Sequence, residues 1–244
     1  MAAMLETDGL VAGYEPGLPI VRGASIRVEP QEIVVILGPN WAGKSSLIKA
    51  IAGLVPISGG AVRLAGAEIT RVPAHRMVQA GLAFVPQTEN VFPLLSVQDN
   101  LRVSAGGLPR AETAARIEEM FALFPDLARQ RRLMAGSLSG GQRQMLAAAR
   151  ALIVRPRVLM LDEPSAGLSP KFVEMVFARL AEIRRGGVTV VLVEQNARAA
   201  LAIGDRAYVL VEGRVAHEAP AATLWDDPVV AELYLGQRSD GGGR

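Results

Sequence analysis

The chain has 244 residues, of which 50% are apolar and 20% are charged, so it can bury one large core. Its 26 basic and 24 acidic residues leave a formal net charge of only +2, and without a long basic block this balance argues against a nucleic-acid partner. The absence of cysteine excludes disulfides and thiolate metal sites, and no apolar run approaches the roughly 20 residues of a membrane helix.

The first third of the chain predicts strands around one glycine-rich loop. Residues 5–37 and 61–72 alternate apolar and polar residues, as antiparallel strands with one buried face do. The run IVVIL at 33–37 is apolar throughout, which favours a buried parallel strand, and residues 43–54 read as a helix. The segment GPNWAGKS at 38–45 therefore joins the end of a strand to the start of a helix.

That loop has the residue types of a phosphate site. Backbone N–H groups at a helix start can hold phosphate oxygens, the Lys44 ammonium can reach β- and γ-phosphates, and the Ser45 hydroxyl can ligate Mg²⁺. Lys44 is therefore a candidate catalytic residue as well as a binding residue. We expect nucleotide contacts from Gly38, Pro39, Asn40, Trp41, Ala42, Gly43, Lys44, Ser45 and Ser46.

The middle of the chain predicts helices. Within residues 110–124, four large apolar side chains fall at helical spacing, namely Ile117, Met120, Phe121 and Phe124. A second helix should begin in the run LSGGQ at 138–142. Its apolar face consists of Met145, Ala148, Ala149 and Leu152. Glycines and Ser139 at this helix start leave N–H groups free to meet an anion.

The last third predicts two more buried strands and a hairpin. Residues 158–161 are apolar and are followed by Asp162 and Glu163, at the strand end where open α/β sheets bind ligands. Asp162 would hold Mg²⁺, and Glu163 would orient or deprotonate an attacking water, because phosphoryl transfer needs mainly positioning and charge neutralisation. A further strand is expected at 188–193, and residues 206–218 suggest a hairpin that turns at 212–213.

With these motifs in this order, the chain resembles ABC-type ATPases. The resemblance implies an α/β fold, with a P-loop NTPase core of ABC type, flanking antiparallel strands and an inserted helical subdomain at about residues 88–155. It implies one nucleotide-binding domain over residues 1–236 that binds and hydrolyses ATP with Mg²⁺. We expect the glycine-rich tail at 237–244 to be disordered.

The resemblance also implies roles that residue chemistry alone does not specify. Tyr14 would stack on adenine, and residues 165–169 would contact a second subunit. The segment at the start of the second helix would grip the γ-phosphate bound to the phosphate loop of that subunit. Its residues are Ser139, Gly140, Gly141 and Gln142.

Two glutamines complete the expected catalytic set. Gln87, in the run AFVPQ, would contact Mg²⁺ and the attacking water, as a metal-binding and catalytic residue. Gln195 stands where the wider superfamily has a histidine, and we expect it to contact the γ-phosphate. Because an amide does not titrate, its contribution should depend little on pH. Ser169 likewise replaces an aspartate that many relatives carry.

The phosphate loop departs from the family pattern at two positions. Trp41 replaces a glycine, and Ser46 replaces a threonine. If position 41 needs a positive φ, tryptophan there costs on the order of 1 to 3 kcal/mol in backbone strain and could weaken nucleotide binding. The alternative is that Trp41 points to solvent and the loop adapts. The sequence leaves both open.

Finer motifs narrow the resemblance to one ATP-binding subunit of branched-chain amino-acid importers. They are VEQN at 193–196, PQTENVFPLLSVQDNL at 86–101, LFP at 123–125 and YLG at 234–236. The implied function is hydrolysis of ATP to power import of a small polar solute, branched-chain or other amino acids first. Close relatives of this subunit serve importers of urea and short amides.

The implied partners follow from the same resemblance. They are a second ABC ATPase chain, as a hetero- or homodimer, two integral-membrane permease subunits and, indirectly, a periplasmic or extracellular solute-binding protein. The chain would lie at the cytoplasmic face of the inner or plasma membrane. A repair or translation ATPase is disfavoured, because those usually carry two cassettes or a long coiled-coil insertion.

Overall fold

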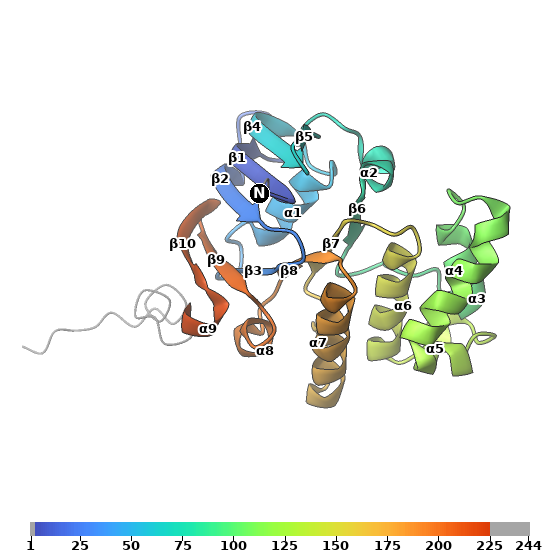
Figure 1. Ribbon diagram of the computed structural model, residues 1–244. Coiled ribbons are helices and arrows are strands. Elements are labelled where there is room, and N and C mark those ends of the chain that lie inside the picture. The colour runs from blue at the N-terminus through green and yellow to red at the C-terminus, as the bar shows by residue number, and fades with distance from the viewer. Residues whose placement is uncertain (1–2, 225–244) are drawn as a thin grey trace, which may run out of the picture.

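The computed structural model describes residues 3–224, which form two β-sheets and the helices that cover them (Figure 1). The YLG motif at 234–236 and the tail at 237–244 lie outside the described residues. Within residues 3–224, no helix combines the length and the apolar character needed to cross a bilayer.

The larger sheet has six strands in the order β10-β9-β3-β8-β7-β6. All run parallel except β10, which pairs antiparallel with β9. Every residue of β3, β7 and β8 is buried, because both faces of the sheet are covered. The strands are β3 (Ile33–Leu37), β6 (Leu82–Val85), β7 (Val158–Asp162), β8 (Thr189–Val193), β9 (Arg206–Val211) and β10 (Arg214–Pro220). The predicted strands and hairpin in these regions are therefore confirmed.

This sheet separates two apolar cores. On one face, Val35 and Leu37 of β3 pack with the helical side of the molecule. On the other face, Val34 and Ile36 pack toward helix α1 (Lys44–Ile51) and the smaller sheet. The strict alternation places successive residues of one strand in different cores.

The smaller sheet is antiparallel, as the alternating pattern predicts, in the order β2-β1-β4-β5. Helix α1 contacts β1 and β2 as well as β7 and β8, so it lies between the two sheets (Figure 1). The predicted strand range 61–72 is wrong in its bounds, because a turn at 65–66 separates the last two strands. The strands are β1 (Leu5–Ala12), β2 (Val21–Val28), β4 (Ile57–Leu64) and β5 (Ala67–Glu68).

Helix α1 is shorter than the predicted range 43–54. It ends at Ile51, and Gly53 follows with a φ of 75°. A Cβ atom on Gly53 would lie 2.9 Å from the carbonyl oxygen of Val72. The chain therefore leaves the helix here through a left-handed turn that glycine accepts without strain.

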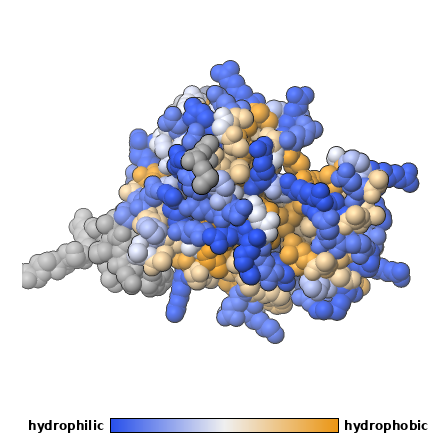
Figure 2. Space-filling view, in the orientation of Figure 1, coloured by the Kyte–Doolittle hydropathy of each residue, from blue (hydrophilic) through white to orange (hydrophobic). Residues whose placement is uncertain are grey.

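Four α-helices follow one another between β6 and β7, with a 3₁₀ turn at Ala135–Ser137 before the last of them. Figure 1 shows α3, α4 and α5 grouped at one side of the molecule, with α6 between this group and α7 (Pro170–Arg185). The four are α3 (Val97–Ser104), α4 (Arg110–Leu123), α5 (Pro125–Arg129) and α6 (Gly140–Leu152). The predicted apolar stripe on α4 and its end is confirmed as core, and hydrophobic surface gathers beside this helical group in Figure 2.

Three short helices complete the described chain. Helix α2 (Ala74–Ala80) precedes β6, α8 (Ala197–Leu201) follows β8, and α9 (Ala221–Leu224) follows β10. The carboxyl ends of β3, β6, β7 and β8 thus lead into the loops at 38, 86, 163 and 194 that carry most of the predicted site residues.

Candidate nucleotide site

The loop after β3 is shaped by two glycines. Gly38 has a φ of 148°, and a Cβ atom there would lie 2.1 Å from the carbonyl oxygen of Leu210. Gly43 has a φ of 96° and is the N-cap of α1, which no side chain caps. Both positions therefore need glycine, and the first N–H groups of α1 remain available to a ligand.

Lys44 is almost fully enclosed by this loop, with 5% of its surface exposed. Its Nζ donates hydrogen bonds to the carbonyl oxygens of Gly38, at 2.8 Å, and Pro39, at 2.9 Å. Burial lowers the pKa of Lys44, while the carboxylates of Glu163 and Asp162 act in the opposite direction. The ammonium is thus desolvated and fixed, which favours an anion such as a phosphate beside it.

A hydroxyl and a carboxylate meet beside Lys44. Ser45 Oγ donates a 2.8 Å hydrogen bond to Asp162 Oδ1, at the end of β7. Burial raises the pKa of Asp162, and the bond from Ser45 opposes that shift. Protein Mg²⁺ sites commonly use one or two such oxygens and complete the shell with water and phosphate, so this donor pair fits Mg²⁺.

Glu163 is clamped by two amides from neighbouring strand ends. Gln87 Nε2 donates to Glu163 Oε2 at 2.9 Å, and Gln195 Nε2 donates to Oε1 at 2.8 Å. Glu163 itself has a φ of 47°, which is uncommon for a residue with a side chain. The sequence predicted Gln87 to contact Mg²⁺ and the attacking water, and Gln195 to contact the γ-phosphate. The structure shows both amides on Glu163 instead of free in the cavity, and the two predicted roles stay predictions.

These groups open into a cavity of about 670 Å³ at the start of α1. The lining includes the predicted residues Tyr14, Gln87, Glu163 and Gln195 and most of the phosphate loop. It also includes Ile20, which no sequence signal indicated. Its lining residues are Tyr14, Ile20, Asn40, Trp41, Ala42, Gly43, Lys44, Ser45, Ser46, Gln87, Glu163 and Gln195.

The structure confirms part of each interpretation of Trp41 that the sequence left open. Its φ is 70°, so the position has the left-handed backbone that strains a side chain. Its side chain nevertheless points to solvent and is 98% exposed. The indole therefore covers no other residue of the phosphate loop.

The segment at the start of α6 lies elsewhere. None of residues 139–142 lines the cavity. Ser139 and Gln142 form a capping box, in which Gln142 N donates to Ser139 Oγ at 3.3 Å and Ser139 N donates to Gln142 Oε1 at 3.0 Å. A Cβ atom on Gly141 would lie 2.4 Å from the ring of Phe172, so this glycine also serves packing against α7.

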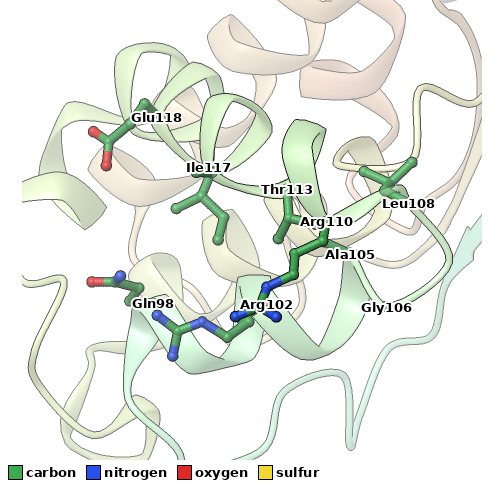
Figure 3. A pocket seen from close by; sticks show the side chains of 10 residues that line it. Gln98, Arg102, Ala105, Gly106, Leu108, Arg110, Thr113, Ile117 and Glu118 are labelled. Carbon is green, nitrogen blue, oxygen red and sulfur yellow. The ribbon is translucent and has the colours of Figure 1, made fainter.

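Another hollow, of about 500 Å³, lies between α3 and α4 and contains none of the predicted site residues (Figure 3). Arg102 and Arg110 stand at its rim. Arg102 is paired with Asp99, and Glu118 on the opposite rim is paired with Arg131. The charges of this hollow are thus largely neutralised within the chain.

Residues 21–166 match the family model described as ABC transporter. The chain belongs to the ABC transporter family of ATPases. As a member, this ABC ATPase binds ATP, hydrolyses it in a reaction coupled to transport, and works with membrane permease subunits.

Relatives of this ABC ATPase match it over almost their full length. It is 44% identical to the probable branched-chain amino acid transport ATP-binding protein LivF of Archaeoglobus fulgidus, covering 96% of this chain and 99% of that one. It is 38% identical to the high-affinity branched-chain amino acid transport ATP-binding protein BraG of Pseudomonas aeruginosa, covering 93% and 97%. It is 34% identical to the lipopolysaccharide export system ATP-binding protein LptB of Escherichia coli K12, covering 96% and 98%.

Solved structures agree with the fold. A nucleotide-free ATP-binding cassette from an ABC transporter superimposes with a TM-score of 0.85 at 26% identity, covering 96% of this chain and all of that one. The predicted α/β fold of ABC type is therefore confirmed.

Proposed function

We propose that this ABC ATPase powers the import of a small polar solute, with branched-chain or other amino acids as the first candidates. The clamp of Gln87 and Gln195 on Glu163 beside the phosphate loop supports the hydrolytic part of this proposal. Similarity to LivF and BraG supports the cargo class. Import itself rests on the kinship with these proteins.

In the proposed mechanism, Lys44 and the N–H groups of the loop bind the β- and γ-phosphates of ATP. Ser45 and Asp162 would hold Mg²⁺, which when bound neutralises charge on the phosphate oxygens. Glu163 orients the attacking water and accepts its proton. The amide groups of Gln87 and Gln195 hold that carboxylate in place.

The remaining contacts involve adenine and a second ATPase chain. Tyr14 is 55% exposed at the cavity and would stack on adenine. Because residues 139–142 lie outside the cavity, we propose that a second chain brings its own copy of this segment to the γ-phosphate. The bound nucleotide then favours the closed pair through its greater affinity for that state, and one chain alone should be a poor ATPase.

Closure would reach two permease subunits through the region of Gln87. A hollow of about 370 Å³ next to this glutamine is lined by Pro86, Glu89, Asn90 and Arg150, among others, between β6 and α6. In this arrangement the chain works at the cytoplasmic face of the inner or plasma membrane. A solute-binding protein outside the membrane would deliver the cargo.

Three alternatives remain for specific reasons. The strained backbone at Trp41 favours a weakened site, in which the chain supplies only residues 139–142 to an active partner. Urea or short amides are alternative cargoes, and the 34% identity to LptB leaves an export role to be tested. Uptake of labelled leucine, urea and acetamide by cells with and without the intact gene distinguishes these cargoes. Unchanged uptake of all three would contradict these three cargoes.

The hydrolytic mechanism is tested by Glu163→Gln in the complex with its ATPase partner. We expect the ATPase rate to fall roughly 100-fold or more while ATP stays bound, because the proton acceptor is lost and the phosphate contacts remain. Glu212→Gln is the matched control, since Glu212 has the same φ of 47° but its side chain is exposed and does not line the nucleotide cavity. A Glu163→Gln complex that keeps its rate would contradict this role of Glu163.

A further inference from the structure

Glu194 is a buried acidic residue to which the mechanism above gives no role. It follows β8 directly and is only 1% exposed. It does not line the nucleotide cavity, although its neighbour Gln195 does. Burial of a carboxylate costs several kcal/mol unless hydrogen bonds compensate, so its surroundings need an explanation.

Four hydrogen-bond donors converge on this carboxylate. Ser165 N donates to Oε1 at 2.9 Å, and Ser165 Oγ donates to Oε2 at 2.8 Å. The backbone N–H groups of Gln195, at 3.1 Å, and Asn196, at 3.4 Å, also donate to Oε2. None of these four donors is a cation. Burial raises the pKa of Glu194, and the same hydrogen bonds oppose that shift.

The Glu194 carboxylate thereby joins the loop that leads to α7 with the loop that follows β8. On one side, Ser165 opens the turn that leads to α7, and Leu168 N in this turn bonds back to Ser165 O at 3.2 Å. Leu168 also packs next to Gly140, at the start of α6. On the other side, the backbone of Gln195 is held while its side chain donates to Glu163.

We propose that Glu194 is a positioning residue that couples the loop at 165–169 to Gln195 and, through Gln195, to Glu163. This inference rests on the proposed catalytic role of Glu163. A glutamine at 194 would lose one acceptor oxygen and direct an amide N–H group at these donors. Gln195 would then hold Glu163 less firmly, although Glu194 itself does not line the nucleotide cavity and the phosphate loop would not change. A shift of the 165–169 loop would reach Glu163 by the same path.

Glu32 provides a comparison within the same chain. It is also a buried glutamate, and its Oε2 accepts a 2.7 Å hydrogen bond from Glu29 N. Its Oε1 instead forms an ion pair with Arg206 at 2.9 Å. Because Glu32 precedes β3, it lies at the opposite end of the sheet from the nucleotide cavity. Glu32→Gln therefore controls for the general cost of disturbing a buried carboxylate.

The test is a double-mutant cycle on the ATPase rate of the complex with its partner chain. Glu194→Gln should lower kcat about tenfold and change KM for ATP less than about twofold, because Lys44 and the phosphate loop are untouched. In a Gln195→Ala background, the same change should lower kcat by less than about twofold, because the hydrogen bond from Gln195 to Glu163 is already absent. Ser165→Ala is a milder change for the case that Glu194→Gln fails to fold. It should likewise lower kcat less in the Gln195→Ala background than in the wild type.

Equal losses in both backgrounds would overturn the coupling, and so would a comparable fall in kcat for Glu32→Gln. A selective rise in KM would also overturn it, because it would place Glu194 in nucleotide binding. An inactive wild-type complex would overturn the proposed function together with this inference. Wild-type activity with additive losses would overturn the inference alone, so the two failures are distinguishable.

Discussion

Two helix starts in this ABC ATPase carry glycines and both are proposed to bind phosphate, yet they are built differently. Helix α1 begins at Gly43 with no side-chain cap, so its first N–H groups are left for a ligand. Helix α6 begins at Ser139 with a complete capping box. The first N–H groups of α1 are therefore open to a ligand within one chain. At the start of α6, the capping box already accepts part of the hydrogen bonding.

The glycines differ for the same reason. Gly38 and Gly43 have positive φ angles, and the backbone of the phosphate loop depends on them. Gly140 and Gly141 have ordinary helical backbone and instead give room to Leu168 and Phe172. A glycine-rich motif in a sequence therefore does not show why its glycines are needed. In the first loop the cause is backbone geometry, and in the second it is close packing against a neighbouring helix.

The largest effect is expected at α6. Gly141→Ala places a methyl group 2.4 Å from Phe172 Cδ1 and should lower the free energy of unfolding by about 1 to 3 kcal/mol, as overpacking does. Gly140→Ala is the matched control, because its methyl group would meet only the end of the Leu168 side chain at 3.1 Å. Urea unfolding of both variants measures the difference. Equal stability of the two would refute the packing explanation.

A smaller effect of opposite sign is expected at the phosphate loop. Trp41→Gly should raise the free energy of unfolding by about 1 kcal/mol, because it relieves a left-handed backbone and removes no packing. Mg-ATP titration of wild type and variant then tests the binding site. Similar affinities support an active site in this chain, whereas binding by the variant alone supports the weakened-site alternative.

Ala65→Gly is the control for that comparison. Ala65 has a φ of 48° in the exposed turn between β4 and β5, away from the cavity. It should gain stability for the same backbone reason without a change in ATP affinity. A change in its ATP affinity would mean that backbone relief alone alters the site.

The smallest effect concerns pH and Asp162. Because burial raises its pKa in the folded state above the ordinary value of 3.8, the folded state holds this proton more tightly than the unfolded state. Stability should therefore fall, relative to Asp162→Asn, as pH rises from below 3.8 through the raised pKa. A tenfold difference in proton affinity between the two states corresponds to about 1.4 kcal/mol.

Unfolding curves in EDTA at several pH values measure this difference. Added Mg²⁺ should reduce it at neutral pH, because the metal would bind the ionised carboxylate in the folded state only. A difference between wild type and Asp162→Asn that does not vary with pH would contradict the raised pKa.

The buried strands could be predicted from the sequence almost residue by residue. The runs at 33–37 and 158–161 are apolar throughout, and burial on both faces leaves no other pattern. The range 61–72 was harder, because a half-buried edge tolerates a turn at 65–66 within an alternating pattern. The end of α1 depended on the φ of Gly53, which residue type alone does not fix.

At the site, too, features set by neighbouring residues could be predicted more closely than features set by distant ones. Local motifs placed Lys44 and Ser45 correctly at the start of α1, because strand–loop–helix geometry follows from neighbouring residues. The bonds of Glu163 to Gln87 and Gln195 join residues 76 and 32 positions apart, and only the order of the strands determines them. Glu194 gave no signal of its own, since a glutamate after a strand is usually solvated.

The exposed indole of Trp41 also makes the molecule its own optical probe. The sequence contains two tryptophans, and the other, Trp225, lies outside the described residues. Indole emission shifts when water around the ring is displaced, and Trp41 stands at the mouth of the nucleotide cavity. With Trp225 replaced by phenylalanine, the natural fluorescence of the chain would follow, without any attached dye, when nucleotide or a partner chain covers that loop.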